Sequence, residues 1–477
     1  MKRMLYTLSA ILLIGLMPLR GQEVVSSTYI TSVTQGELPA EFQFFARNGI
    51  DLYKVLYTTP DIEGRTDTAS GLLVLPQVEA NLAVPLMVVQ HGTVAGPEDV
   101  PSNMRGGWEL AGLFGALGYA TIAPDMLGLG ESRGFHPYVH AATETSAAID
   151  MMYAARALDA GDDGFAMNDQ VFVTGYSQGG HAAQALHREL QANYAGEFNV
   201  TAATHMSGPY SISGTMYDLI LSDQPYGTVA YAPYTLMSYN EVYGLYDDIR
   251  EYVKEPYASM CEEFYRGDIE LFDLNFRLID TLIAREGAPV TRFMLQDTLI
   301  ASVENNPDHP LRVALQDNDT YDWAPQAPTR LYYCEGDDQV PFRNSVIADS
   351  VMRENGAPNF NSANLSETAT HTECITPAVT NTVFFFAAYA APVTSTRVAY
   401  PEPVAFWPNP AKQDIQVRGL PRGGNLRLVD LNGQVHGQWR TNAGTMSLRL
   451  PLLSSGIYVL SMESDQGYWT QKLVIGQ

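Results

Sequence analysis

A serine between two glycines is the residue with the clearest chemical potential in this sequence. The pentapeptide Gly175-Tyr176-Ser177-Gln178-Gly179 follows the apolar segment 170–174 and precedes a helical segment at 181–190. Glycines on both sides of a serine permit a tight turn between a strand and a helix, and this turn exposes the serine hydroxyl. An alcohol is a poor nucleophile until a base takes its proton, and the base needs an acid to orient it. The sequence therefore predicts Ser177 as a nucleophile that requires a histidine and a carboxylate.

The elements that must position this serine alternate along the chain. Apolar segments with strand character are found at residues 72–75, 85–90, 119–123, 170–174, 200–206 and 329–334. Helical periodicity occurs between them, at 108–114, 145–158 and 181–190, and again at 379–389. This alternation is typical of a mainly parallel sheet flanked by helices. Between about 209 and 327 the alternation is lost, and the tyrosine-rich, helical pattern, including a helical stretch at 262–283, predicts an inserted cap.

From about residue 72 to 391 the chain resembles α/β-hydrolases, and more narrowly it is similar to secretory lipases and related exported esterases. The resemblance is carried by His91-Gly92-Thr93 and by the segments 175–180, 336–341 and 371–374. It implies the α/β-hydrolase fold and the hydrolysis of carboxylic esters, a reaction that requires no cofactor and no metal. The cap matches these families poorly, so the resemblance does not indicate which ester is cleaved.

The histidine can be chosen by its position along the chain. In the α/β-hydrolase fold the acid and then the histidine follow the serine in sequence. Seven of the nine histidines precede the last predicted strand of the sheet, which leaves His371 and His436. His436 belongs to the C-terminal tail, beyond a proline-rich segment. The predicted base is therefore His371.

The acid is expected just after the strand that ends at Cys334, where the sequence reads Glu335-Gly336-Asp337-Asp338-Gln339-Val340-Pro341. This segment resembles the acid loop of α/β-hydrolases, in which the acid lies four residues before the proline. The resemblance assigns the role to Asp337. Asp338 is the alternative, because a shift of one residue in the loop would exchange the two.

The tetrahedral intermediate needs two backbone N–H groups that point at its oxyanion. Gln178, which follows the nucleophile, is predicted to supply one. The segment Gln90-His91-Gly92-Thr93 resembles the His-Gly oxyanion loop of lipases, which makes Thr93 the second donor, with Val94 as the alternative. The ring of His91 is assigned a structural role, and so is Asp125 in the turn that follows a core strand.

The three cysteines leave room for one disulfide. Cys334 and Cys374 each lie a few residues from a predicted triad member, and the fold must bring those members together. A bond between these two is one interpretation. Three buried thiols, with Cys261 as the third, are the other.

The two ends of the chain predict export. Residues 1–22 combine a basic start, a short apolar run and small or polar residues, which is the layout of a signal peptide. Residues 392–402 form a proline-rich linker after the catalytic domain, 23–391. Residues 403–477 then resemble the C-terminal sorting domain of type IX secretion through Phe406-Trp407-Pro408-Asn409-Pro410-Ala411 and the segments 428–433, 453–460 and 472–475. This resemblance implies a small β-sandwich-like domain and the type IX machinery as a partner. It also implies a secreted or surface-attached location beyond the outer membrane. A carbohydrate-binding module is the alternative for the tail.

Charge and composition narrow the function. A formal charge of −25 disfavours nucleic acid and anionic membranes as partners, because both attract basic residues. No segment after the signal peptide is apolar enough to span a membrane.

A serine esterase or lipase is the leading function. The alternatives are a serine peptidase of this fold and a non-catalytic binding or adhesion protein on a hydrolase scaffold. Six cap tyrosines have two interpretations: they line an amphipathic pocket able to stack on sugars or aromatic esters, or they are ordinary core or surface residues. They are Tyr217, Tyr226, Tyr231, Tyr234, Tyr239 and Tyr243.

Overall fold

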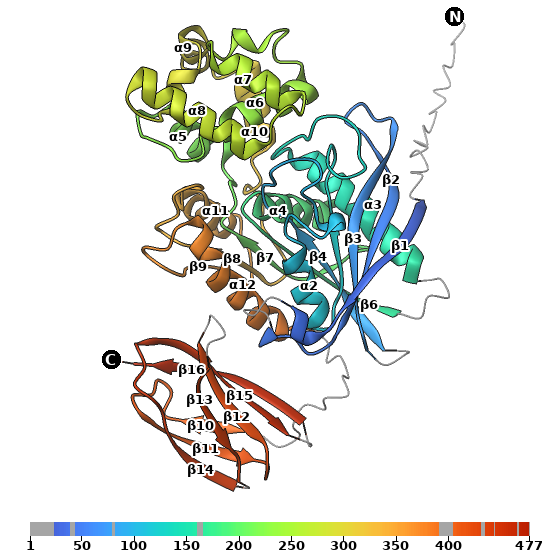
Figure 1. Cartoon of the computed structure of the whole chain (residues 1–477), viewed down its shortest axis with the longest axis vertical. Helices are drawn as coiled ribbons and strands as arrows, with labels where there is room; N and C mark the ends of the chain where they lie inside the picture. The colour runs from blue at the N-terminus through green and yellow to red at the C-terminus, as the bar shows by residue number, and fades with distance from the viewer. Residues whose placement is uncertain are drawn as a thin grey trace, which may run out of the picture.

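A computed structural model describes residues 23–38, 43–78, 82–159, 166–390, 404–430, 435–442, 444–464 and 467–476. The predicted signal peptide, 1–22, and the predicted linker, 392–402, lie outside these residues. The described chain comprises a sheet flanked by helices, a helical cap and a C-terminal pair of small sheets (Figure 1).

The large sheet has nine strands in the described residues, in the order β1-β2-β3-β5-β4-β6-β7-β8-β9. The ladders from β1 to β5 are antiparallel, and those from β5 through β4 to β9 are parallel. The strands are β1 Val24–Val33, β2 Ile50–Pro60, β3 Thr66–Pro76, β4 Ala83–Gln90, β5 Ala120–Pro124, β6 Ala166–Tyr176, β7 Val200–Met206, β8 Thr329–Tyr333 and β9 Phe360–Asn364. The predicted mainly parallel sheet is confirmed. Strands β1, β2 and β9 were not predicted from the sequence. Strand β9 lies at an edge of the sheet, and its mostly polar sequence carries no signal of a buried strand.

Helices cover both faces of this sheet. On one face, α2 (Trp108–Ala116) and α12 (His371–Ala387) contribute Phe114 and Phe386 to a core shared with the central strands. On the other face, α3 (Ala141–Asp159) and α4 (Gln178–Glu189) pack Met152 and Leu186 against the same strands. Helix α11 (Arg343–Glu354) packs beside β8 and β9. The α/β-hydrolase prediction is confirmed, because central parallel strands buried on both faces are what this fold requires.

Helix α12 begins earlier than the periodicity predicted. The sequence predicts a helix that includes 379–389, and α12 starts well before this segment, at His371, and ends at Ala387. Thr370 is its N-cap: its hydroxyl accepts from the N–H of Glu373 at 3.4 Å, and the Glu373 carboxylate accepts from the N–H of Thr370 at 2.9 Å. Pro377 within the helix masks the helical signal. The consequence is that His371 is presented from a capped helix start.

The cap is a helical layer between β7 and β8, on one side of the sheet (Figure 1). Its α-helices in the described residues are α5 Tyr217–Leu221, α6 Tyr231–Tyr243, α7 Tyr257–Tyr265, α8 Leu271–Glu286, α9 Asp297–Asn305 and α10 Pro310–Asp317. The helical stretch predicted at 262–283 is divided between α7 and α8. The chain breaks between α7 and α8, where Gly267 has a φ of +75°, a conformation that glycine adopts without strain.

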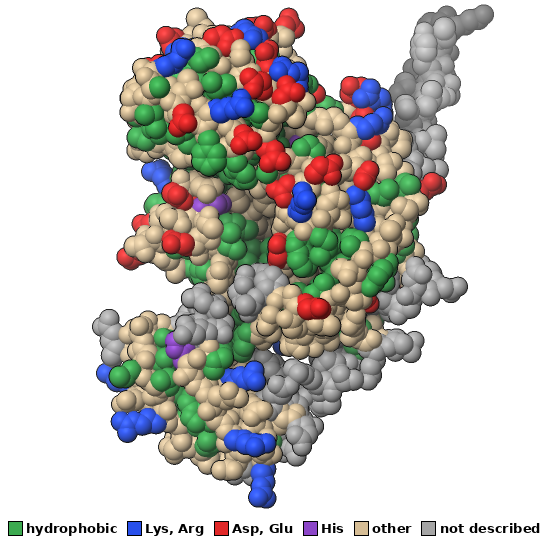
Figure 2. All heavy atoms as spheres, viewed as in Figure 1, with side chains coloured by type: hydrophobic (Ala, Val, Ile, Leu, Met, Phe, Trp, Pro, Cys, Tyr) green, Lys and Arg blue, Asp and Glu red, His purple; other side chains and the backbone are tan. Residues whose placement is uncertain are grey.

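The C-terminal domain consists of two small sheets in its described residues, β10-β11-β14 and β13-β12-β15-β16. Their strands are β10 Ala405–Trp407, β11 Asp414–Leu420, β12 Asn425–Asp430, β13 Val435–Arg440, β14 Gly444–Arg449, β15 Gly456–Ser464 and β16 Gly467–Ile475. Val417, Leu428 and Leu460 are fully buried in a core to which both sheets contribute. This confirms the small β-sandwich-like domain. Figure 2 shows basic side chains on its visible face, whereas acidic and basic side chains are mixed over the cap.

Candidate active site

Ser177 lies in the sharp turn between β6 and α4. Its φ of 61° and ψ of −125° fall in a region that L-residues rarely adopt, and the hydrogen bonds of the surrounding strand and helix hold it there. A Cβ atom at Gly175 would lie 2.0 Å from the carbonyl oxygen of Gly179, and one at Gly179 would lie 2.0 Å from that of Gln90. Both positions therefore require glycine. The turn leaves Ser177 with 9% of its surface exposed, at the base of a cavity under the cap.

The ring of His371 is bonded to one of the two candidate acids. Its Nδ1 lies 2.7 Å from Oδ2 of Asp337. The other carboxylate oxygen of Asp337 accepts from the backbone N–H groups of Gln339 and Val340, at 3.0 and 2.8 Å. These bonds fix the carboxylate against the ring. Nε2 of His371 is buried without a hydrogen-bond partner among the described residues, so it is available to a reacting hydroxyl.

Asp338 performs a different task from its neighbour. Its Oδ1 accepts from the backbone N–H of His371 at 3.0 Å. That N–H belongs to the first turn of α12 and has no partner within the helix, so the carboxylate satisfies it and also meets the positive end of the helix dipole. The two adjacent aspartates thus hold the ring and the backbone of the same histidine.

Tyr176 links the serine turn to the histidine helix. Its hydroxyl donates to the backbone oxygen of His371 at 2.5 Å, and the two rings lie 5.0 Å apart between centroids. Burial raises the pKa of Tyr176, so the phenol keeps the proton that it donates. Since Tyr176 directly precedes Ser177, this contact brings the serine and the histidine to the same end of the sheet.

A disulfide joins the acid loop to the histidine helix. Cys334, at the end of β8, is bonded to Cys374, three residues after His371, and their Cα atoms are 5.9 Å apart. Cys261 is a free, buried cysteine in the cap. The bond therefore ties together the two segments that carry Asp337 and His371.

The loop after β4 lies against the serine. A Cβ atom at Gly92 would be 3.4 Å from the backbone oxygen of Tyr176 and 3.8 Å from Cβ of Ser177. The next residue, Thr93, bonds through its hydroxyl to the hydroxyl of Tyr138 at 2.9 Å. Val94 is buried in a small apolar cluster. The loop after β4 therefore lies beside Ser177, directly before the point where α4 begins at Gln178.

The ring of His91 and the carboxylate of Asp125, both predicted to be structural, contact groups in the neighbouring loops. The ring of His91 contacts the backbone oxygens of Gly92 and Asp125 at 2.7 and 3.1 Å. The carboxylate of Asp125 accepts from the hydroxyl of Ser70 at 2.6 Å and from the N–H of Ser102 at 3.0 Å. These contacts hold the loops after β4 and β5 in register behind the site.

A buried polar network behind Gln178 was missed by sequence reasoning. Nε2 of Gln178 donates to Glu144 at 3.1 Å and lies 2.9 Å from Nε2 of His136. The second oxygen of Glu144 is 2.8 Å from Nδ1 of His181, and Nε2 of His181 is 2.8 Å from the backbone oxygen of Asn318, at the end of the cap. Burial lowers the pKa of His136 to about 4, so its neutral ring accepts from Gln178. No sequence motif joins these residues; only the position of His181 four residues after Ser177 could have drawn attention to them.

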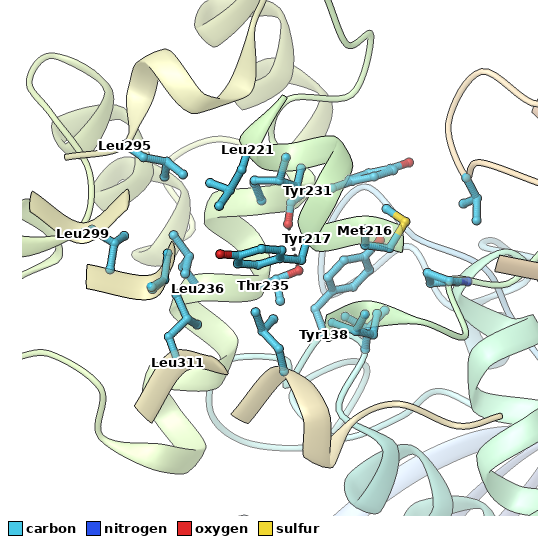
Figure 3. A pocket seen from close by; sticks show the side chains of 18 of the residues that line it. Tyr138, Met216, Tyr217, Leu221, Tyr231, Thr235, Leu236, Leu295, Leu299 and Leu311 are labelled. Carbon is cyan, nitrogen blue, oxygen red and sulfur yellow. Dashed lines mark hydrogen bonds between the residues drawn. The ribbon is translucent and has the colours of Figure 1, made fainter. Parts of the chain in front are cut away.

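A cavity under the cap reaches Ser177 and Gln178 (Figure 3). Tyr217 and Tyr231 are the predicted cap tyrosines that line it. Tyr226, Tyr234 and Tyr239 are instead buried in the core of the cap, so they cannot stack on a substrate there. Among the described residues, no group of three or more His, Cys, Asp or Glu side chains is placed to hold a metal ion. Within the same residues, no helix combines the length and the apolar character needed to cross a membrane.

Comparison with known proteins indicates which class of protein has this fold. The family of the secretion system C-terminal sorting domain matches residues 405–476. The esterase LipA from Xanthomonas oryzae, described as degrading the rice cell wall, is 26% identical with a TM-score of 0.68, over 78% of this chain and 98% of its own. A hydrolase candidate from Legionella pneumophila is 24% identical (TM-score 0.68; 77% and 98%), and Candida antarctica lipase A in its closed state is 14% identical (0.57; 77% and 82%). No protein of curated function matches the sequence.

These likenesses define an α/β-hydrolase-fold protein with a C-terminal sorting domain, and they support a hydrolase of this fold. The sorting domain marks a protein that type IX secretion exports, to be released or attached to the cell surface.

Proposed function

We propose that this protein is a serine hydrolase that cleaves carboxylic esters through an acyl-enzyme. In this proposal Ser177 is the nucleophile, His371 the general base and acid, and Asp337 the acid that orients the histidine. The observation that carries it is the 2.7 Å contact between Asp337 and the ring of His371, on a helix whose start is bonded to Tyr176 beside the strained serine. A rare backbone conformation at a serine, next to a paired histidine, is the arrangement that nucleophilic catalysis needs.

The first half of the reaction forms the acyl-enzyme. Oγ of Ser177 attacks the ester carbonyl carbon while its proton passes to Nε2 of His371. The backbone N–H groups of Gln178 and Thr93 receive the oxyanion. The bond to the alcohol oxygen then breaks, and this oxygen takes the proton from Nε2. Asp337 stabilises the imidazolium between these two transfers.

The second half of the reaction regenerates the free enzyme. Water gives a proton to Nε2 of His371 as its oxygen attacks the acyl carbon. The bond to Oγ of Ser177 breaks, the serine recovers its proton from Nε2, and the carboxylic acid leaves. Each proton that His371 takes is given back within the same half-reaction, so the cycle needs no further cofactor.

Export is the second part of the proposal. Residues 1–22 act as a signal peptide that is removed before the catalytic domain, 23–391, crosses the outer membrane. The linker, 392–402, then separates this domain from the sorting domain that the type IX machinery recognises. The family match at residues 405–476 supports this order.

The test is hydrolysis of p-nitrophenyl esters, from acetate to palmitate, by the chain without residues 1–22. Ser177→Ala is expected to reduce kcat by roughly four to six orders of magnitude, as removal of a serine nucleophile does. Ser350→Ala, at an exposed serine on α11, is the matched control and is expected to retain full activity. A fluorophosphonate probe should label Ser177 of the folded protein.

Three outcomes would contradict the proposal in different ways. Activity that survives Ser177→Ala would place the nucleophile elsewhere. Turnover of peptide amides with none of esters would favour a peptidase. The absence of both turnover and labelling would favour a binding protein on a hydrolase scaffold.

A further inference from the structure

The cavity under the cap has a composition that selects a chemical class of ligand. It encloses about 930 Å³ of empty space, its opening to solvent included. We propose that it binds the acid part of the ester as a long, unbranched hydrocarbon chain, with the alcohol part outside it. This inference rests on the proposed ester hydrolysis and names its substrate class.

The lining of the cavity is nearly without free polar groups. None of the described residues that line it is charged. The hydroxyls of Tyr138, Tyr231 and Thr235 are already bonded, to Thr93 at 2.9 Å, to Gln339 at 3.2 Å and to the backbone oxygen of Tyr231 at 2.9 Å, respectively. A sugar would lose its hydrogen bonds to water in such a cavity and gain few in return, which costs free energy for every unpaired hydroxyl. A hydrocarbon loses no hydrogen bonds there and gains free energy with each methylene that leaves water.

Tyr217 is the exception in this lining, and its place is informative. Its hydroxyl is buried without a hydrogen-bond partner among the described residues. Figure 3 shows its ring in the middle of the cavity, between Tyr138 on one side and Leu295, Leu299 and Leu311 on the other. One hydroxyl cannot satisfy a sugar, but its ring provides an apolar wall along the path of a chain.

The geometry of the reaction decides which part of the ester enters. Ser177 and Gln178 line the cavity, whereas His371 does not. Nε2 of His371 must reach the alcohol oxygen to give it a proton, so the alcohol has to lie on the histidine side. The carbonyl carbon must reach Oγ of Ser177 and its oxygen the N–H of Gln178. The acyl chain is therefore the part that continues into the cavity.

The far end of the cavity sets the length of chain that fits. The hydrogen bond between Tyr138 and Thr93 marks the end nearest the predicted oxyanion loop. Leu299 of α9 and Leu311 of α10 lie toward the other end (Figure 3) and are 5% and 6% exposed. A bulkier side chain at Leu299 would shorten the cavity without touching the serine, the histidine or the acid.

The experiment compares kcat/KM for p-nitrophenyl dodecanoate and p-nitrophenyl acetate. The wild type is expected to prefer dodecanoate at least tenfold, because a difference of even one methylene in an apolar pocket is worth about 10-fold or more. Leu299→Phe should reduce the dodecanoate-to-acetate ratio at least tenfold. Val313→Phe is the matched control: Val313 is on α10, exposed and not part of the lining, so this variant should keep the wild-type ratio. Thermal unfolding of each variant checks that it is folded.

A binding measurement separates this inference from the proposed function. Dodecanoate itself, titrated calorimetrically into Ser177→Ala, should bind, and Leu299→Phe in that background should weaken binding at least tenfold. Cleavage of acetate with no preference for longer chains, and no dodecanoate binding, would overturn the acyl site while leaving the esterase intact. Dodecanoate binding without cleavage of any ester would overturn the esterase and keep the cavity as a site for aliphatic chains. Absence of both would overturn both.

Discussion

The sheet and the cap differ in where their charged side chains lie. At the end of the sheet, the side chains of Asp337, Glu144 and His181 are buried and bonded to named partners at 2.7 to 3.1 Å. In the cap, no Asp, Glu, Lys or Arg of the described residues is buried, and ion pairs such as that between Arg250 and Glu262 lie at the surface. Buried polar groups fix geometry because each needs its partner, whereas apolar packing tolerates exchange of side chains.

This contrast separates the chemistry of the protein from its choice of substrate. A reaction that moves protons needs groups held in one arrangement, and the strand ends supply it. A cavity that distinguishes substrates by length needs only volume and apolar walls, and the cap supplies these. Substitutions at the strand ends should therefore affect catalysis or folding strongly, and those in the cap should affect selectivity.

The largest expected effect comes from the paired aspartates. Asp337→Asn is expected to reduce kcat for p-nitrophenyl esters about 10⁴-fold, since the imidazole loses the carboxylate that sets its tautomer and stabilises its charge. Asp338→Asn should reduce kcat by about tenfold at most, because an amide oxygen can still accept the N–H of His371. Each variant should unfold near the wild-type temperature. Equal losses from the two substitutions would contradict the assignment of the acid.

The next effect concerns stability, and it contrasts the two regions directly. Glu144→Ala should lower the free energy of unfolding by about 3–5 kcal/mol, because it leaves His181 and Gln178 buried without their acceptor. Glu144→Gln should cost much less, since its amide keeps a hydrogen-bonding group beside Nδ1 of His181 and its oxygen still accepts from Gln178. Arg250→Ala, in the exposed ion pairs of the cap, should produce only a small change. Urea unfolding measures all three, and a glutamine variant as unstable as the alanine variant would contradict this account of the network.

The same contrast explains what could be predicted from the sequence. Ser177 stands in a motif whose glycines have a steric cause, and His371 follows from chain order, so the sequence alone could propose both. Asp337 was harder, because its neighbour is also an aspartate. Their roles differ only through contacts with the ring and the backbone of His371, which lie 34 and 33 positions away.

The lining of the cap cavity could not be predicted from the sequence, for the complementary reason. Its helices pack through an apolar core, and many apolar sequences can do so; thus tyrosines that line the cavity cannot be told from tyrosines that fill the core. Tyr217 and Tyr234 look alike in sequence, yet the first lines the cavity and the second is 4% exposed within the cap core. Edge strand β9 and the early start of α12 were missed because polar residues and Pro377 interrupt the expected patterns.

The smallest expected effect is a loss of stability at acidic pH, which should arise from buried histidines around the sheet rather than from the cap. Burial lowers the pKa of His136 and His140 to about 4 and that of His187 to about 3. Below the ordinary histidine pKa of about 6.5 the unfolded chain takes up protons that the folded chain does not, so stability falls as the pH decreases from about 6.5 toward 4.

His187 is the residue with which to test this, because both of its ring nitrogens are buried without partners among the described residues. His187→Phe keeps an aromatic ring against Trp323 and should remove about 2 kcal/mol of the stability lost between pH 7 and pH 5. The cap control is His309→Asn, which retains an acceptor at the N-cap of α10 and should change the pH dependence less. Urea unfolding at the two pH values gives the difference. If His187→Phe loses as much stability as the wild type on acidification, buried histidines of the sheet are not what makes the fold sensitive to acid.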